Sequence, residues 1–383
     1  MNQAVAGGDA DRARMIDAMR GVAAMAVAYF HCRLLTWIGI RAFIAGHHRA
    51  ISLDTVLAYL SIPFVWGPIG VPIFFVISGY CIHHSQAVRL ARNPQYRLDA
   101  REFLLRRFIR IYPVLFCALL LTFALDSISL HYLPHNEQLG DLSLRTFFAN
   151  LLGIQGVASP VYGSDTVLWT LSLEVQFYML YPLLLAAQRR LGPDHLLAWL
   201  MALSVVSYVL LERRGTLIFA TYWSSWYLGA WIAEREVRGL RFPRRYLLVA
   251  SPILLVFGCV ASMRDARYLW CLPWALAFTP LFVVMLHAHA NHGLAMRALE
   301  KIGDFSYSLY IVHIPIFMLL ASCLFHGTRQ VSILWSIGLF PVGLATAYIF
   351  HLLVERPAMG VLRRRSMQRR VVASELVQLD GHR

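Results

Sequence analysis

The chain contains 383 residues, of which 58% are hydrophobic and 15% are charged, and its mean hydropathy is +0.56. These values exclude an ordinary soluble domain and predict an all-α, polytopic membrane protein. The formal net charge is +14, but the basic residues lie between apolar segments and form no RNA- or DNA-binding motif, so no nucleic acid is expected as a partner. The six cysteines lie in or beside apolar runs without the spacing of a metal site, and no metal is expected.

Ten segments are apolar and approach the roughly 20 residues that a membrane-spanning helix needs. They cover approximately residues 15–38, 63–84, 108–128, 167–187, 196–211, 216–233, 246–262, 268–290, 305–325 and 331–354. A further apolar stretch near 144–157 is too short to cross a bilayer, and we expect a re-entrant segment there. The chain is thereby divided into an N-terminal segment (1–14), a transmembrane domain (15–357) and a basic tail (358–383).

The distribution of basic residues sets the expected orientation. If both termini are cytoplasmic, most arginines fall in the loops of the cytoplasmic side, as the positive-inside rule requires. Counting 144–157 as a full crossing would reverse the orientation of every later span. Membrane lipids are therefore expected around the whole transmembrane domain, with the N-terminal segment and the tail on the cytoplasmic side.

The first expected span, MIDAMRGVAAMAVAYFH, carries Asp17, Arg20 and His31 within an apolar run. On a helix Arg20 and His31 lie about three turns and roughly 16 Å apart on one face, and Asp17 shares that face. An ionised group that faces lipid costs several kcal/mol, so this face is expected to turn toward protein or a watery cavity. The alternative is a local Asp17–Arg20 pair with His31 as an interfacial histidine.

The second span, GPIGVPIFFVISGYCIHH, contains Ser78 among small residues, which permits close approach of either a neighbouring helix or a ligand. The sequence RRFIRIYP then places Arg106, Arg107 and Arg110 at the mouth of the third span. These arginines are either positive-inside anchors or a site for a polyanionic ligand such as a diphosphate, which guanidinium groups bind in bidentate fashion.

The sequence WTLSLEVQFYMLYP places Glu174 inside an apolar helix, where a carboxylate needs a partner. A hydrogen bond to His31 would fix the tautomer of the imidazole and raise its basicity, and a salt bridge to an arginine is the alternative. The sequence GDFSYSLYIVHIPI carries Tyr307 and His313 on a later span, where such residues are often interfacial anchors. The histidines of HAHANH (287–292) lack a convergent acid, so an interfacial cluster is favoured there over a metal site.

Five blocks in this order resemble the acyltransferase-3 family of integral membrane O-acyltransferases. The blocks are Arg20-x10-His31 preceded by Asp17, PIFFVISGY, RRFIRIYP, WTLSLEVQFYMLYP, and FSYSLYIVHIPI followed by VERP. The resemblance covers about residues 17–357. It implies a bacterial inner-membrane enzyme with ten helices that transfers an acyl group, most simply acetyl, from cytoplasmic acyl-CoA to a sugar hydroxyl of an envelope or exported glycan.

The resemblance also implies roles for individual residues. His31 matches the catalytic histidine and Arg20 the motif arginine, with Asp17 beside it, and Glu174 matches the buried acid of the family. Donor binding is expected from the basic block, completed by three further side chains; these residues are Arg106, Arg107, Arg110, Ser78, Tyr307 and His313. The expected partners are acyl-CoA and a glycan or lipid-linked sugar acceptor. The alternatives are a transporter or flippase of an anionic lipid or glycan, and O-acylation of a small glycosylated metabolite.

Overall fold

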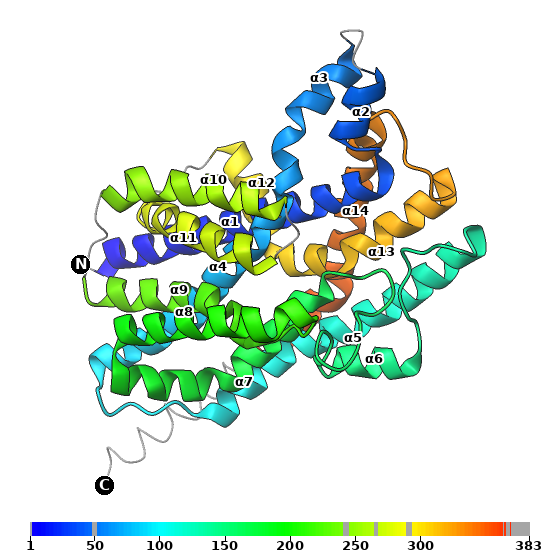
Figure 1. Cartoon of the computed structure of the whole chain (residues 1–383). Coiled ribbons are helices and arrows are strands. Elements are labelled where there is room, and N and C mark those ends of the chain that lie inside the picture. The colour runs from blue at the N-terminus through cyan, green and yellow to red at the C-terminus, as the bar shows by residue number, and fades with distance from the viewer. Residues whose placement is uncertain are drawn as a thin grey trace.

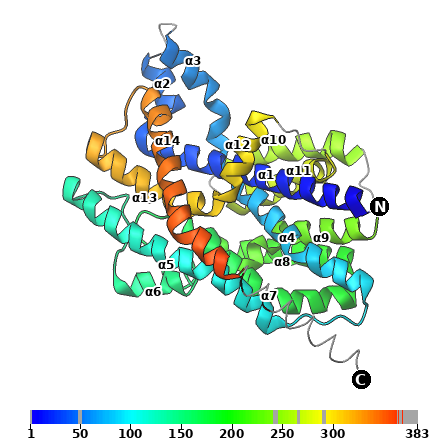
Figure 2. The same ribbon diagram turned by 180° about the vertical axis from the view of Figure 1, so that it is seen from behind.

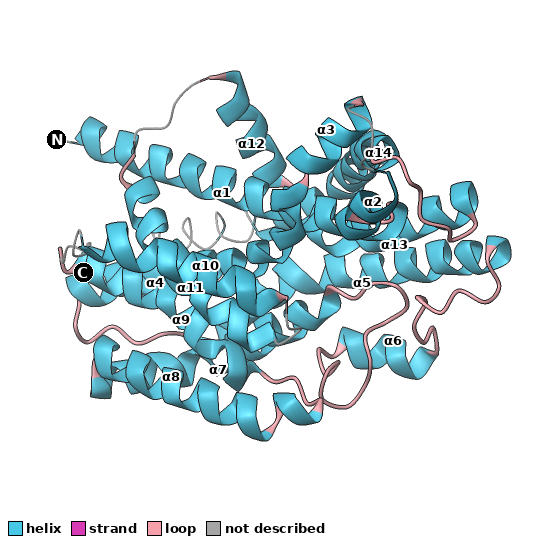
Figure 3. Cartoon of the chain, turned by 45° about the horizontal axis from the view of Figure 1, so that its top comes forward, coloured by secondary structure: helices cyan, strands magenta, loops and turns pink. Residues whose placement is uncertain are grey.

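The structure is a computed structural model, and it describes residues 2–47, 52–239, 245–263, 267–288 and 293–362, together with residues 364 and 368. Helices account for 82% of the structure, and the described ranges contain no strand, only two isolated bridges (Figure 3). The all-α class expected from the sequence is therefore confirmed. The last four residues of HAHANH (289–292) and most of the basic tail lie outside the described residues.

The α-helices follow one another along the chain with short connections (Figure 1). They are α1 (Asn2–Thr36), α2 (Ile40–His47), α3 (Leu53–Leu60), α4 (Gly70–Arg92), α5 (Ala100–Tyr132), α6 (Leu144–Leu151), α7 (Leu168–Leu191), α8 (Pro193–Leu210), α9 (Phe219–Val237), α10 (Ser251–Ser262), α11 (Arg267–Leu286), α12 (Leu294–Asp304), α13 (Ser306–Phe325) and α14 (Leu334–Phe350). Shorter 3-10 or π turns are η1 (Ile62–Ile69), η2 (Glu212–Arg214), η3 (Tyr246–Ala250) and η4 (His351–Glu355). All ten expected segments fall on these elements.

Six helical stretches in the described residues are long and apolar enough to cross a membrane. They include α4 with the turns before it, α5, α7, α8, α13 and α14, whereas α10 and α11 are shorter apolar helices. The chain is thus a multi-pass membrane protein. The count of ten crossings and the orientation remain predictions. Of the other two expected spans, α1 carries Asp17 and Arg20 inside its apolar part, and α9 ends in charged residues.

The helices form a single packed body. α4 packs on α9 and α1, and α9 packs in turn on α8 and α11, which makes up one half of the molecule in Figure 1. α13 packs on α5, α1 and α14, and α14 crosses the front of the molecule in Figure 2, on the face turned away from the viewer in Figure 1. α1 therefore contacts both halves, and its buried alanines and valines lie between them.

Glycines allow the helices around α1 and α4 to approach backbone to backbone. A Cβ atom added at Gly79 would overlap the carbonyl oxygen of Trp226 on α9, and one added at Gly229 would overlap the carbonyl oxygen of Val76 on α4. A Cβ at Gly70 would likewise overlap the Ala23 carbonyl on α1. Gly70 and Gly79 of the second span therefore serve close helix packing, one of the two alternatives that the sequence left open.

Replacing Gly79 by valine is expected to destabilise the fold. The added side chain meets backbone, which cannot move aside, and overpacking typically costs about 1–3 kcal/mol or more. The measurement is the midpoint of thermal unfolding of the detergent-purified protein. Gly338→Val on α14 is the matched control, because a Cβ there has no atom within 4 Å. Equal midpoints for the two variants would contradict the close-packed crossing.

Three short helices are not predicted from the sequence, namely α2, α3 and α12. Of these, α12 lies along α1 (Figure 3), and Gly303 and Gly21 permit that contact, because a Cβ at either would overlap a carbonyl oxygen of the other helix. α12 is amphipathic with only eleven residues, so its apolar side is too narrow to be recognised as a span. It nevertheless positions α1 relative to α13, which begins two residues after α12 ends.

The segment near 144–157 contains α6, a helix of eight residues, followed by turns. Such a helix is too short to cross a bilayer, as expected. The loop that follows is attached to α5, because Asp126 accepts hydrogen bonds from the Ser164 amide at 2.7 Å and the Ser164 hydroxyl at 2.8 Å. Burial raises the pKa of the neighbouring Asp165 well above its ordinary value. The re-entrant position in a membrane stays a prediction.

Candidate active site

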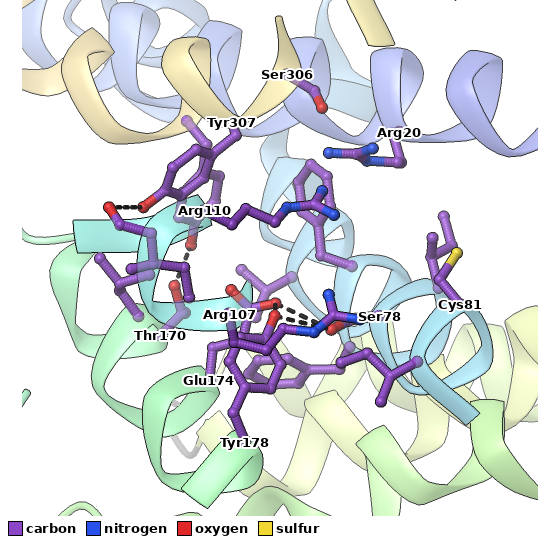
Figure 4. Close-up of a pocket in the computed structure, with 18 residues that line it drawn as sticks. Arg20, Ser78, Cys81, Arg107, Arg110, Thr170, Glu174, Tyr178, Ser306 and Tyr307 are labelled. Atoms are coloured by element: carbon purple, nitrogen blue, oxygen red, sulfur yellow. Dashed lines mark hydrogen bonds between the residues drawn. The ribbon is translucent and has the colours of Figure 1, made fainter. Parts of the chain in front are cut away.

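A cavity lies where α1, α4, α5, α7 and α13 meet (Figure 4). Its empty volume, including the part open to solvent, is about 970 Å³, which is sufficient for a ligand of cofactor size. Its polar lining consists of Arg20 from α1, Ser78 and Cys81 from α4, Arg107 and Arg110 from α5, Thr170, Glu174 and Tyr178 from α7, and Ser306, Tyr307 and Tyr310 from α13. The remaining lining residues are apolar.

Three guanidinium groups enter this cavity from two helices, as Figure 4 shows. Arg20 forms a loose ion pair with Asp17 at 3.7 Å. Arg107 lies over the ring of Tyr178 at 5.4 Å and over that of Phe103 at 5.6 Å. Arg110 has no hydrogen bond or ion pair to any described residue. Buried cations are normally paired, so a set of this kind is suited to an anionic ligand.

Glu174 is the one carboxylate that lines the cavity. It accepts a hydrogen bond from the Ser78 hydroxyl at 2.9 Å and another from the Tyr178 hydroxyl, and the Trp226 indole donates to Ser78 at 3.3 Å. In the described part of the chain Glu174 bonds neither to His31 nor, within 4 Å, to an arginine. With three arginines and one glutamate, the lining carries a net positive charge.

Four residues of the expected site do not line the cavity, and two of them, Arg106 and Asp17, lie near its arginines. Arg106 pairs with Glu102 at 2.8 Å, and its side chain is 47% exposed. It lies a full turn before Arg110, nearer the start of α5, so it reaches the first-turn acid Glu102 instead of the cavity. Asp17 also stays outside the lining and contacts the site only through Arg20.

The expected donor-site residues Ser78 and Tyr307 do line the cavity, and the Tyr307 hydroxyl lies 3.5 Å from the Ile111 carbonyl oxygen. Other lining residues were not predicted as site residues. Tyr178 and Thr170 each lie four residues from Glu174, and Cys81 lies three residues after Ser78. Spacing of three or four residues on a helix places them on the same face, and this signal would have identified them.

His31 is not part of the cavity lining, although Arg20 is, so the helix face that the two residues were expected to share turns to the cavity at Arg20 and to protein at His31. At the level of His31, α1 packs on α13, and the His31 Nδ1 lies 3.0 Å from His313 Nε2. His313 is fully buried and also lies outside the lining, where donor binding was expected of it. Packing between α1 and α13 thus separates the histidines from the cavity.

Tyr310 connects the cavity with the two histidines. Its ring lines the cavity and lies edge-on to the His313 ring, with 6.1 Å between centroids. Its hydroxyl is 2.8 Å from Thr170 Oγ1, and the Phe74 ring contacts it edge-on at 5.5 Å. The order of contacts from the cavity is therefore Tyr310, His313 and His31.

The HAHANH stretch (287–292) is where the sequence raised the question of a metal site. His289 and His292 lie outside the described residues, and the His287 Nδ1 is 2.9 Å from the Val283 carbonyl on its own helix. Among the described residues no group of three potential metal ligands occurs.

Comparison with known proteins relates this geometry to a family. The acyltransferase domain family (Acyl_transf_3) matches residues 14–352. The O-acetyltransferase OatA of Staphylococcus aureus is 26% identical over 308 residues, which cover 70% of this chain and 49% of the relative. The peptidoglycan O-acetyltransferase OatA of Listeria monocytogenes is 29% identical over 309 residues, covering 71% and 48%.

The nodulation protein 10 of Rhizobium leguminosarum is 26% identical over 336 residues, covering 76% of this chain and 82% of the relative. The chain spans about half the length of the OatA relatives. No solved structure matches it significantly. The family match covers nearly all of the transmembrane domain and includes all five blocks apart from the terminal VERP (354–357), which lies just beyond it. This chain therefore belongs to the acyltransferase-3 family.

Proposed function

We propose that the protein transfers an acyl group, most simply acetyl, from cytoplasmic acyl-CoA to a sugar hydroxyl of an envelope or exported glycan across the inner membrane. The observation that carries the proposal is the arginine-lined cavity, in which Arg110 has no hydrogen bond and no ion pair within 4 Å among the described residues. The OatA relatives are O-acetyltransferases by name, which supports the reaction type. A glycan or lipid-linked sugar would be the acceptor.

In this proposal the cavity binds the donor. The phosphates of CoA would pair with Arg107 and Arg110, since guanidinium groups bind phosphate oxygens in bidentate fashion. Arg20 and the hydroxyls of Ser78 and Tyr307 would contact the pantetheine arm. The thioester would then lie toward Tyr310, at the side of the cavity nearest the histidines.

His31 would act as the general base. A ring nitrogen removes the proton from the sugar hydroxyl while the sugar oxygen forms a bond to the thioester carbon. The carbon–sulfur bond then breaks, and the imidazolium returns the proton to the leaving thiolate, which gives an ester and free CoA. A relay in which His31 carries the acyl group has the same overall balance.

The donor and the base must meet for this reaction to occur. The acyl group has to pass Tyr310 and Phe74 to reach His31, because these rings lie at the side of the cavity that leads to His313. A rotation of Tyr310 that breaks its hydrogen bond to Thr170 would open this route. Glu174 would act in the cavity by orienting Ser78 and Tyr178, and not as the direct partner of His31.

Cys81 offers a direct test of donor binding, because it is a free, exposed cysteine of the cavity lining. We expect acetyl-CoA to slow the alkylation of Cys81 by a soluble maleimide at least several-fold. Pantetheine, which lacks the phosphates, should protect much less. Cys81→Ser identifies the labelled position by mass spectrometry.

The reaction itself is tested with the same purified protein. Radiolabelled acetyl-CoA and isolated envelope glycan should give labelled glycan and free CoA. An unchanged labelling rate of Cys81 with saturating acetyl-CoA, together with no acyl transfer, would overturn the proposed function.

A further inference from the structure

The two histidines outside the cavity are joined in one hydrogen-bonded chain. His313 Nδ1 lies 2.9 Å from the Leu309 carbonyl oxygen, and His31 Nδ1 lies 3.0 Å from the Val27 carbonyl oxygen. The His313 Nε2 and His31 Nδ1 atoms are 3.0 Å apart. Each ring thus contacts the carbonyl four residues earlier on its own helix, and the rings also contact each other.

The carbonyl contacts decide where the protons are. A carbonyl oxygen only accepts, so His313 Nδ1 must carry a proton and donate it to Leu309. In neutral His313 the Nε2 atom is then a bare acceptor. The Nδ1 of His31 faces this acceptor and the Val27 carbonyl together, so it must also carry its proton.

Other proton arrangements are unfavourable. If His313 donated from Nε2 in its neutral form, its bare Nδ1 would face the Leu309 oxygen lone pairs at 2.9 Å. If His313 were cationic, the charge would lie on a side chain with 0% exposure, and within the described ranges no carboxylate is hydrogen-bonded to it. The bare Nδ1 of His31 would also face the Val27 oxygen. These contacts leave one neutral tautomer for each ring.

We propose that His313 is a positioning residue that holds His31 as the Nδ1–H tautomer, so that the Nε2 lone pair of His31 is the base that acts on the acceptor hydroxyl. This inference rests on the proposed function. The His31 Nε2 atom has no hydrogen-bond partner among the described residues, and the side chain is half-buried, in contrast to the fully buried His313.

The arrangement also stabilises the charged state of His31. When Nε2 takes up the proton of the sugar hydroxyl, the positive charge is shared with Nδ1–H, whose hydrogen bonds to Val27 and His313 become charge-assisted. His313 does not pass the proton further, because its other nitrogen already donates to the Leu309 carbonyl. The proton therefore stays on His31 until the thiolate leaves.

Two variants of His313 with similar size and polarity distinguish its role in holding the His31 tautomer from its role in helix packing. A glutamine amide oxygen reaches the position of the histidine Nε2 atom, whereas an asparagine amide reaches only the position of Nδ1. His313→Gln therefore retains the acceptor for His31, and His313→Asn loses it. We expect His313→Asn to lower kcat about 100-fold with an unchanged KM for acetyl-CoA, and His313→Gln to stay within about 10-fold of the wild-type kcat.

A second measurement needs no variant of His313. In the wild-type protein labelled with 15N-histidine, the His31 signals, assigned by their loss in His31→Gln, should show a protonated Nδ1 and a bare Nε2. A protonated Nε2, or equal kcat values for the two His313 variants, would overturn the positioning role. If the wild-type protein transferred no acyl group and acetyl-CoA left the labelling of Cys81 unchanged, the proposed function would fail instead, so the two failures are distinguishable.

Discussion

Replacing His31 by alanine is expected to lower acyl transfer at least 100-fold while donor binding is retained. General-base catalysis typically contributes about 10²- to 10⁴-fold, and an acyl-histidine relay would lose all activity. His31 lies outside the cavity lining, so acetyl-CoA should protect Cys81 from alkylation as well as in the wild type. The measurement is the rate of label transfer from acetyl-CoA to glycan, beside the Cys81 protection assay.

The control for this variant is another half-buried histidine. His351→Ala removes a side chain that contacts Glu355 at 2.9 Å near the end of α14, and its transfer rate should stay close to that of the wild type. Full transfer by His31→Ala with intact protection of Cys81 would show that His31 is not the base. Loss of both transfer and protection would instead mean that His31 maintains the fold.

Replacing Arg110 by glutamine is expected to weaken donor binding about 10- to 100-fold. A hydrogen bond to a charged group contributes about 1.5–3 kcal/mol, and among the described residues Arg110 has no hydrogen bond or ion pair within 4 Å that would compete with the donor. The concentration of acetyl-CoA that half-protects Cys81 measures the change. In transfer assays the same loss should appear as a higher KM for acetyl-CoA.

Arg106→Gln is the matched control, since it removes the same charge from the same helix one turn away. Its side chain pairs with Glu102 and is 47% exposed, so the half-protecting concentration should change less than 3-fold, as expected for a surface ion pair. Equal weakening by both variants would mean that the total positive charge of α5 matters, and not a specific site in the cavity.

The all-α membrane class could be predicted from the sequence, because long apolar segments directly indicate membrane-spanning helices. Each expected apolar segment falls on a helix, since long apolar runs have few alternative structures in a membrane. The short helices α2, α3 and α12 were missed, because their polar sides interrupt the hydropathy signal. The contact of α12 with α1 depends on two glycines, which have no distinctive pattern in the sequence.

The candidate site could be predicted only in part. The arginine block of RRFIRIYP was identified from the sequence, and two of its members, Arg107 and Arg110, line the cavity. Arg106 pairs instead with Glu102, and the four-residue spacing of that pair was not used in the prediction. The sequence suggested Glu174 as a hydrogen-bond partner of His31, whereas the structure has His313 there, and the reason for this difference is another one. Glu174 and His313 are both capable of binding an imidazole, and the choice between them depends on which helix packs beside α1, which is a property of the tertiary structure.

One continuous helix, α1, carries both Arg20 at the cavity and His31 beyond it. At 1.5 Å per residue these positions are held roughly 16 Å apart. In the proposed function, α1 would fix the distance that the pantetheine arm has to cover beyond Arg20 to bring the acyl group to His31. A donor whose reactive end is tethered by a shorter arm would be captured at the arginines without ever reaching the imidazole, and would behave as an inhibitor.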